Sequence, residues 1–244
     1  MIPKIIHYCW FGGKTKPQEV ENYINTWKKI CPDYVIKEWN EQNFNINYNQ
    51  YVSQAYNAKK YAFVSDVCRM YALYYEGGIY LDTDVEVINK FDSYLDNKSF
   101  LCEEQRGRLI GTATIGAEPN MRWIKDFLTL YNNISFIQNN GKYDILPNTS
   151  RLTNFMKEYK GEKPTIYPID YFCAKDYKSG KIHITPNTIC IHHYVGSWVE
   201  PLKFQIIESK LWELIGLNKN LNISGKIYWK IIIPLKNIFS STNL

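Results

Sequence analysis

The sequence predicts an α/β fold with a mixed central sheet flanked by helices. Three observations indicate this class: an apolar, β-branched run opens the chain, a helix-patterned segment and a second strand follow it, and strand and helix patterns keep alternating afterwards. The 244 residues and 45% hydrophobic content suit one compact domain. We expect that domain to cover residues 1–220 and a basic, apolar tail to occupy residues 221–244.

The first elements form a β-α-β unit. Residues 2–10 are a β-branched run that ends at two glycines, which is typical of a buried strand before a turn. Residues 17–30 place apolar side chains at helical spacing, and Cys31-Pro32 closes that segment before a second strand at residues 34–39. A strand this early in the chain favours a central sheet.

The next segment leads to a pair of carboxylates. Residues 40–50 are rich in Asn and Gln and predict a loop, and residues 51–76 predict one helix that ends at Gly77-Gly78. Residues 79–87 then predict one short strand whose apolar residues give way to acids. Ligands of α/β proteins usually bind where such strands end.

Alternation continues through the second half of the chain. We expect strands at residues 99–103 and 109–117, helices at residues 120–131 and 148–159, and extended segments between residues 182 and 191. Neither an internal repeat nor an interdomain linker is evident.

Composition limits the compartment and the partners. The chain has no run of about 18 apolar residues and its start lacks the regions of a signal peptide, so we expect a cytoplasmic protein. Its six cysteines lie in apolar or aromatic stretches without a C-x-x-C pair and predict reduced, mostly buried thiols. A net charge of +5 permits anionic partners such as nucleotide diphosphates or phospholipid, and we expect no nucleic-acid partner. Some of the 20 Tyr and 7 Trp could line a site that stacks on bases or sugars, although core packing is an equal alternative.

Asp82 and Asp84 are the first candidate ligands. Residues two apart on a strand share one face, so both carboxylates could hold one hard cation. Mg²⁺ and Mn²⁺ prefer carboxylate oxygens and complete their shells with phosphate oxygens. The alternative is a solvated acidic turn after a strand.

The surroundings of this pair resemble a known family. Ser65-Asp66-Val67-Cys68-Arg69, followed by Glu76-Gly-Gly-Ile-Tyr-Leu-Asp-Thr-Asp84, resembles the sugar-binding DxD region of glycosyltransferase family 32. That family contains bacterial capsule and lipopolysaccharide transferases and yeast mannosyltransferases, and the glucosylating domain of large clostridial toxins is similar. The first strand, with Ile6-His7-Tyr8-Cys9-Trp10-Phe11-Gly12-Gly13, and the segment His192–Trp198 also resemble family motifs.

The resemblance implies a GT-A fold, a Mn²⁺ or Mg²⁺ cofactor and retention of anomeric configuration. It implies transfer of a hexose from a nucleotide sugar, with a UDP-sugar preferred and GDP-mannose as the alternative donor. The implied acceptor is a growing surface polysaccharide or an undecaprenyl-linked glycan.

The resemblance also assigns roles to residues of the donor site. Asp66 and Arg69 would hold donor hydroxyls, although at this spacing they could also form an ordinary surface ion pair. Trp10 would stack on the nucleotide base, with a core position as the alternative. Tyr80 would pack near the donor, with a core role as an equal alternative.

Two further groups come from the segment His192–Trp198. His192 and His193 are candidates for the third metal ligand that the resemblance implies, although a histidine facing the core is an alternative. Neighbours on an extended segment point to opposite faces, so we expect only one of them to face the site, and we favour His192. Ser197 and Trp198 would lie near the diphosphate.

No side chain identifies itself as a covalent nucleophile. Glu103 and Glu104 follow a strand, but we interpret them as surface glutamates. Front-face attack assisted by the leaving phosphate is therefore the expected mechanism.

The tail at residues 221–244 mixes lysines with large apolar and aromatic residues. This composition suits a segment lying on anionic lipid at the inner face of the plasma membrane, where a lipid-linked acceptor would be found. A terminal helix docked on the domain is the alternative.

Two alternative functions also fit parts of the sequence. A phosphatase of the haloacid dehalogenase type also has a strand ending in Asp-x-Asp, but Glu86 stands where that superfamily has Thr or Val. A non-catalytic carbohydrate- or nucleotide-binding module would explain the aromatic residues and leave the acidic pair without a purpose.

Overall fold

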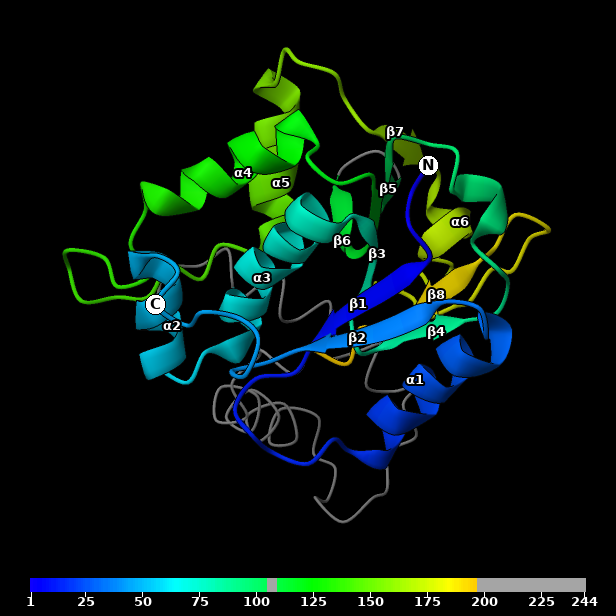
Figure 1. The fold of residues 1–244 in the computed structure, drawn as a ribbon, viewed down its shortest axis with the longest axis horizontal. Helices are drawn as coiled ribbons and strands as arrows, with labels where there is room; N and C mark the ends of the chain where they lie inside the picture. Colours follow the sequence, from blue (N-terminus) through cyan, green and yellow to red (C-terminus); the bar gives the residue numbers. More distant parts are fainter. Residues whose placement is uncertain (105–108, 197–244) are drawn as a thin grey trace, which may run out of the picture.

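The computed structural model describes residues 1–104 and 109–196, and its centre is a mixed sheet of six strands (Figure 1). The strands run in the order β2-β1-β3-β6-β5-β7. Their bounds are β1 Ile5–Cys9, β2 Val35–Trp39, β3 Gly78–Leu81, β5 Ser99–Glu103, β6 Ile110–Ala117 and β7 Thr165–Tyr167. β1 pairs in parallel with β2 and β3, β6 runs antiparallel to β3 and β5, and β7 pairs in parallel with β5. The predicted mixed sheet is confirmed.

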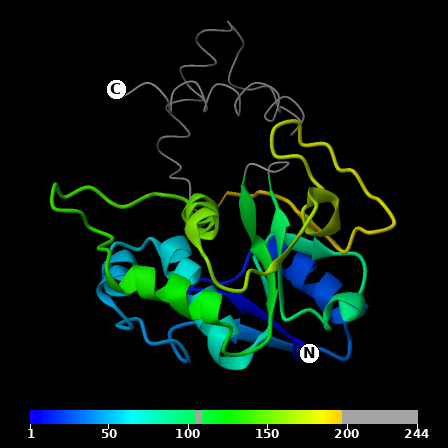
Figure 2. The same cartoon turned by 90° about the horizontal axis from the view of Figure 1, so that it is seen from above.

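Helices cover both faces of this sheet. Their bounds are α1 Gln18–Ile30, α2 Gln50–Asn57, α3 Tyr61–Glu76, α4 Arg122–Asn132, α5 Asn148–Glu158 and α6 Ile169–Phe172. In Figure 2, α3 and α4 lie on one side of the strands and α1 on the other. Strand alternation sends Tyr80 into the core cluster under α3 and α4, and it sends Ile79 and Leu81 into the cluster under α1.

A second, two-stranded sheet lies beside the first. β4 (Val85–Val87) pairs antiparallel with β8 (Cys190–His192), and the Trp27 indole of α1 donates to the Val85 carbonyl at 2.8 Å. The expected single strand over residues 79–87 is therefore wrong. The chain turns after β3, where the Val85 amide donates to the Asp82 carbonyl at 3.0 Å, and the second half of the segment enters the other sheet.

The expected single helix over residues 51–76 is also wrong, because the chain forms α2 and α3 with a break between them. Lys59 adopts a positive φ of 58°, and its amide donates to the Tyr56 carbonyl while the Lys60 amide donates to the Ala55 carbonyl. These two bonds form the usual left-handed ending of a helix. Glycine normally occupies the left-handed position, and here a lysine does.

A buried histidine fixes the turn that enters β3. The Trp39 indole donates to His7 Nδ1 at 3.0 Å, so the proton of the neutral ring is on Nε2, which donates to the Gly77 carbonyl at 2.7 Å. Burial lowers the pKa of His7 and keeps it neutral. At Gly78, φ is 102° and a Cβ atom would lie 2.7 Å from the Ile5 carbonyl oxygen, so the turn requires glycine.

The other expectations have mixed outcomes. The helices and strands expected between residues 99 and 159 form, whereas β7 and α6 were not anticipated. Of the extended segments expected between residues 182 and 191, only residues 190 and 191 enter a named strand, β8. All six cysteines are buried and free. None of the helices in the described ranges is both long and apolar enough to cross a bilayer. The tail at residues 221–244 lies outside the described residues.

Candidate functional site

The Asp82–Asp84 pair lies in the turn that leaves the carboxyl end of β3. The Asp82 amide donates to the Ala113 carbonyl of β6 at 2.8 Å, which extends the sheet by one bond, and the turn then brings Asp84 back toward Asp82. The predicted proximity of the two carboxylates is present, but the turn produces it and strand alternation does not.

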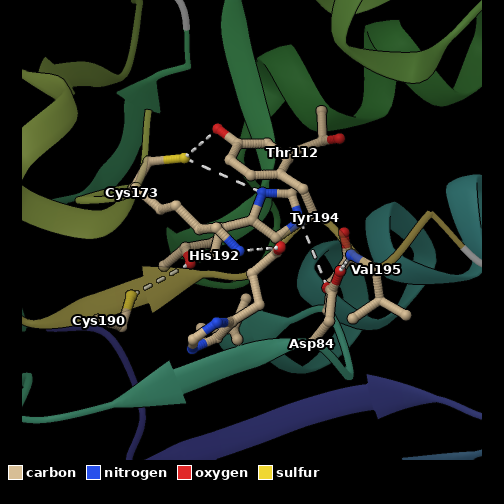
Figure 3. Close-up of polar contacts among 12 residues, drawn as sticks. Asp84, Thr112, Cys173, Cys190, His192, Tyr194 and Val195 are labelled. Carbon is tan, nitrogen blue, oxygen red and sulfur yellow. Dashed lines mark hydrogen bonds and ion pairs between the residues drawn. The ribbon is translucent and has the colours of Figure 1, made fainter. Parts of the chain in front are cut away.

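A third potential ligand reaches this turn from β8. Val85 and His192 are partners in the register of β4 and β8, and His192 Nε2 lies 3.3 Å from Asp84 Oδ1 (Figure 3). Ligand atoms of Asp82, Asp84 and His192 all lie within 4.8 Å of one another. Two carboxylates and one imidazole at this spacing match the ligand preferences of Mn²⁺ and Mg²⁺. We call these three residues the acidic-histidine cluster.

Backbone amides hold Asp84 in place. The Val195 amide donates to Asp84 Oδ2 at 2.8 Å and the His193 amide donates to the Asp84 carbonyl at 2.9 Å. Although burial opposes ionisation, the charge and hydrogen bond of His192, together with the Val195 amide, lower the pKa of Asp84 to about 2. Asp84 is therefore a carboxylate at neutral pH and is available as a ligand.

The ring of His192 is fixed from behind by a thiol and a phenol. The Cys173 thiol lies 3.9 Å from His192 Nδ1 and 2.9 Å from the Tyr194 hydroxyl, and the His192 and Tyr194 rings lie 4.0 Å apart (Figure 3). These contacts leave Nε2 directed toward Asp84. Sequence reasoning did not anticipate Cys173 or Tyr194.

His193, the other candidate histidine, lies outside the acidic-histidine cluster. Its Nε2 is 2.8 Å from Glu86 Oε2, and its ring stacks on Tyr23 at 4.7 Å. The alternation expected for neighbouring residues therefore directs His192, and not His193, at the carboxylates.

A buried arginine holds Asp82 from the other side. Arg69 donates from Nη1 to the Thr112 carbonyl at 2.6 Å and to Asp82 Oδ2 at 3.3 Å, and from Nη2 to Asp66 Oδ1 at 2.8 Å. The guanidinium also lies 4.7 Å from the centre of the Tyr80 ring, whose hydroxyl donates to Asp82 Oδ1 at 2.9 Å. The alternative of an ordinary surface ion pair is thus excluded. Tyr80 is buried and takes the core position.

Burial dominates the ionisation of Asp66. Desolvation raises the pKa of its carboxyl to about 6, against the opposing charge of Arg69. The pair is retained inside α3, where each charge needs the other to offset its loss of water.

Trp10 lines an open hollow beyond the ends of β1 and β2. The hollow has a volume of about 490 Å³. It is lined by Trp10, Gly12, Gly13, Lys14, Lys16, Glu38, Asn40, Glu41, Gln42, Tyr56 and Tyr61. The Trp10 indole donates to the Lys14 carbonyl at 2.6 Å, and at Gly12, where φ is 94°, a Cβ atom would lie 2.4 Å from the Tyr61 ring. Ser197 and Trp198 lie outside the described residues.

Glu104 is a further acidic group of this region, and the expectation of a surface glutamate is wrong for it. Its amide donates to the Leu109 carbonyl at 2.9 Å, which continues the pairing of β5 with β6, and its side chain is partly buried. Burial raises the pKa of Glu104, and the charges of Asp82 and Asp84 raise it further while His192 lowers it. One feature of the sequence could have indicated that Glu104 belongs to the site: it follows a strand directly, as Asp82 follows β3.

Comparisons with known proteins agree with this arrangement. Residues 17–101 match a family model described as a glycosyltransferase sugar-binding region containing a DXD motif. Inositol phosphoceramide mannosyltransferase 1 of Schizosaccharomyces pombe is 27% identical over 111 residues, which are 41% of this chain and 33% of that protein. Inositol phosphoceramide mannosyltransferase 3 of the same yeast is 34% identical over 106 residues, 38% of this chain and 27% of that protein. The matches thus span a third or less of these relatives.

The fold also matches a solved structure. The PaToxG glycosyltransferase superposes with a TM-score of 0.50 at 20% identity, over 64% of this chain and 68% of that one. This likeness concerns the fold and confirms the expected GT-A type. Residues 17–101 are therefore similar to the DXD-containing sugar-binding region of glycosyltransferases, and the fold of the chain is of the GT-A type.

Proposed function

We propose that this protein is a divalent-metal-dependent glycosyltransferase that moves a hexose from a nucleotide sugar to a glycan acceptor. The observation that carries the proposal is the acidic-histidine cluster, whose three ligand atoms lie within 4.8 Å of one another. Asp82 and Asp84 belong to the matched region, and His192 lies outside it. The donor set suits a hard divalent cation, with Asp82, Asp84 and His192 as the protein ligands. When bound, such a cation would neutralise negative charge on the diphosphate of the donor.

The protein's own groups would prepare that site. Arg69 and Tyr80 orient the two oxygens of Asp82, and the Val195 amide orients Asp84. Outer contacts of this kind commonly set ligand geometry, and their loss costs about 10–100-fold in metal affinity or activity. Trp10 at the hollow beyond β1 would stack on the donor base. Front-face transfer with retention follows from the family resemblance.

Two donors are supported on different grounds. A UDP-hexose follows from the sequence resemblance, and a mannose donor such as GDP-mannose is supported by two relatives that are both named mannosyltransferases. The proposed acceptor is a surface polysaccharide or an undecaprenyl-linked glycan. The proposed location is the cytoplasmic face of the plasma membrane.

Slow donor hydrolysis tests this proposal without knowledge of the acceptor. The purified chain is incubated with UDP-glucose or GDP-mannose and Mn²⁺, with and without excess EDTA, and the released sugar is quantified. We expect release from one donor, its loss in EDTA and its return when Mn²⁺ is restored. Equal release in EDTA would contradict the metal dependence, and release of phosphate alone would favour a phosphatase. The anomeric coupling of the transferred sugar, read by proton NMR, tests retention.

A further inference from the structure

The polar groups that the resemblance assigns to the donor sugar are already engaged within the protein. Arg69 uses Nη1 on Thr112 and Asp82 and Nη2 on Asp66, and its side chain is only 6% exposed. Asp66 is buried behind this arginine. Arg69 thus positions Asp66 and Asp82 in addition to any contact with the sugar, and a further acceptor at the site would add to sugar recognition.

Glu104 lies at the end of β5, where its carboxylate could contact the transferred sugar. Glu104 Oε2 lies 3.5 Å from the position where a Cβ on Gly111 would stand, so the carboxylate covers the first residues of β6. The next residue, Thr112, provides the carbonyl that binds Arg69, and Ala113 provides the carbonyl that binds the Asp82 amide. The end of β5 therefore brings Glu104 to the edge of the sheet where Asp82 turns out of β3.

The surroundings of Glu104 combine charge with aromatic rings. The Tyr177 and Tyr194 rings lie 5.1 Å apart in an edge contact. Burial raises the pKa of both phenols, and the charge of Glu104 raises both further, so both lie within range of its charge. Tyr194 in turn packs on His192 (Figure 3). Within residues 1–104 and 109–196, no side chain forms a hydrogen bond or an ion pair with the Glu104 carboxylate. The acceptor capacity of its carboxylate is therefore available to a ligand.

We propose that Glu104 accepts a hydrogen bond from a hydroxyl of the transferred sugar and so recognises the sugar separately from the nucleotide. This inference rests on the proposed function. A carboxylate is a strong acceptor for sugar hydroxyls and repels phosphate, which assigns it to the sugar and not to the diphosphate. Glu104 also stands outside the acidic-histidine cluster, which leaves it free for a neutral ligand.

Calorimetry with paired ligands tests the assignment. GDP-mannose and GDP, and UDP-glucose and UDP, are titrated into the 244-residue chain in Mn²⁺, and the ratio of nucleotide-sugar to nucleotide affinity is compared between variants. Because a hydrogen bond to a charged group is involved, we expect Glu104→Gln to lower the affinity for the preferred nucleotide sugar about tenfold and to leave the nucleotide diphosphate within about twofold. Glu104→Asp, which keeps the charge and withdraws it by one methylene, should lower the same ratio.

Glu103→Gln is the matched control, because it removes the same charge from the adjacent residue, on the opposite face of β5. We expect both of its affinities to equal those of the wild type, and melting temperatures identify any variant that fails to fold. An unchanged ratio in both Glu104 variants would overturn the inference. So would an unchanged ratio with slower transfer, because Glu104 would then serve the acceptor. A wild-type chain that binds neither nucleotide sugar would refute the proposed function itself.

Discussion

Arg69 is expected to stabilise the fold because its buried guanidinium pairs with the buried carboxylate of Asp66 and also holds Asp82. We predict that Arg69→Ala removes the ion-pair partner of Asp66 inside α3, together with the donors that hold Asp82 and the Thr112 carbonyl. Removing one member of a buried ion pair costs about 3–5 kcal/mol, since the remaining charge loses both water and its partner.

The magnitude can be converted into a melting temperature. For a chain of this size 1 kcal/mol corresponds to about 2–4 °C, so the melting temperature should fall by roughly 6–20 °C. Arg122→Ala is the control, since Arg122 pairs with Asp126 on a helix surface where its side chain is 77% exposed. A surface pair contributes little, so this variant should melt with the wild type within experimental error.

Thermal unfolding followed by circular dichroism compares the three proteins in one buffer without added metal. Similar small shifts for Arg69→Ala and Arg122→Ala would show that Arg69 is not a buried structural cation. In that case its contacts with Asp66 and Asp82 would not explain how the cluster is held, and a direct role on the donor would regain support.

The remaining predictions concern the cluster and the hollow. Asp84→Asn keeps the size of the side chain but removes a ligand charge, so donor hydrolysis should fall by several orders of magnitude with an unchanged circular dichroism spectrum; activity near the wild-type rate would refute the ligand role. Tyr80→Phe removes the hydroxyl bound to Asp82, and Mn²⁺ titration should show affinity lower by about tenfold, whereas equal affinity would mean that the contact is incidental. Trp10→Ala should weaken binding of the free nucleotide by about 1–3 kcal/mol in calorimetry. If nucleotide affinity is retained while the melting temperature collapses, Trp10 is a packing residue.

The order of helices and strands could be predicted from the sequence better than the turns and breaks that separate them. Apolar periodicity identified α1 and the strands of the central sheet other than β7, because buried faces leave a regular signature. The sequence does not indicate the break between α2 and α3, because the left-handed residue at the break is Lys59 and not glycine. The backbone hydrogen bonds that end α2 do not depend on side-chain type. The turn at Asp82 was hidden for a related reason: both halves of residues 79–87 are apolar, and they belong to different sheets.

The candidate site was predictable where one motif holds its residues, and less so where distant segments meet. Asp82 and Asp84 could be named from their spacing and context. Alternation predicted that only one of His192 and His193 faces the site, and the structure shows that it is His192. Cys173 could not be assigned, because its contact with His192 depends on how the end of α6 lies beside β8. Glu104 could not be assigned, because its position depends on the pairing of β6 with β5. Asp66 and Arg69 are buried, and the apolar character of the other residues of α3 had indicated this burial.

The three side chains of the acidic-histidine cluster stand on segments more than a hundred positions apart in the sequence, with β8 supplying the last of them. Both aspartates are therefore synthesised long before the histidine. A nascent chain that already contains residues 17–101 has only two of the three ligands. A cation that requires all three would bind only after β8 has paired with β4. At a free concentration one hundred times its dissociation constant, such a ligand favours the folded chain by about 2.7 kcal/mol. Cellular metal supply would then influence how much of the newly synthesised protein reaches its finished form.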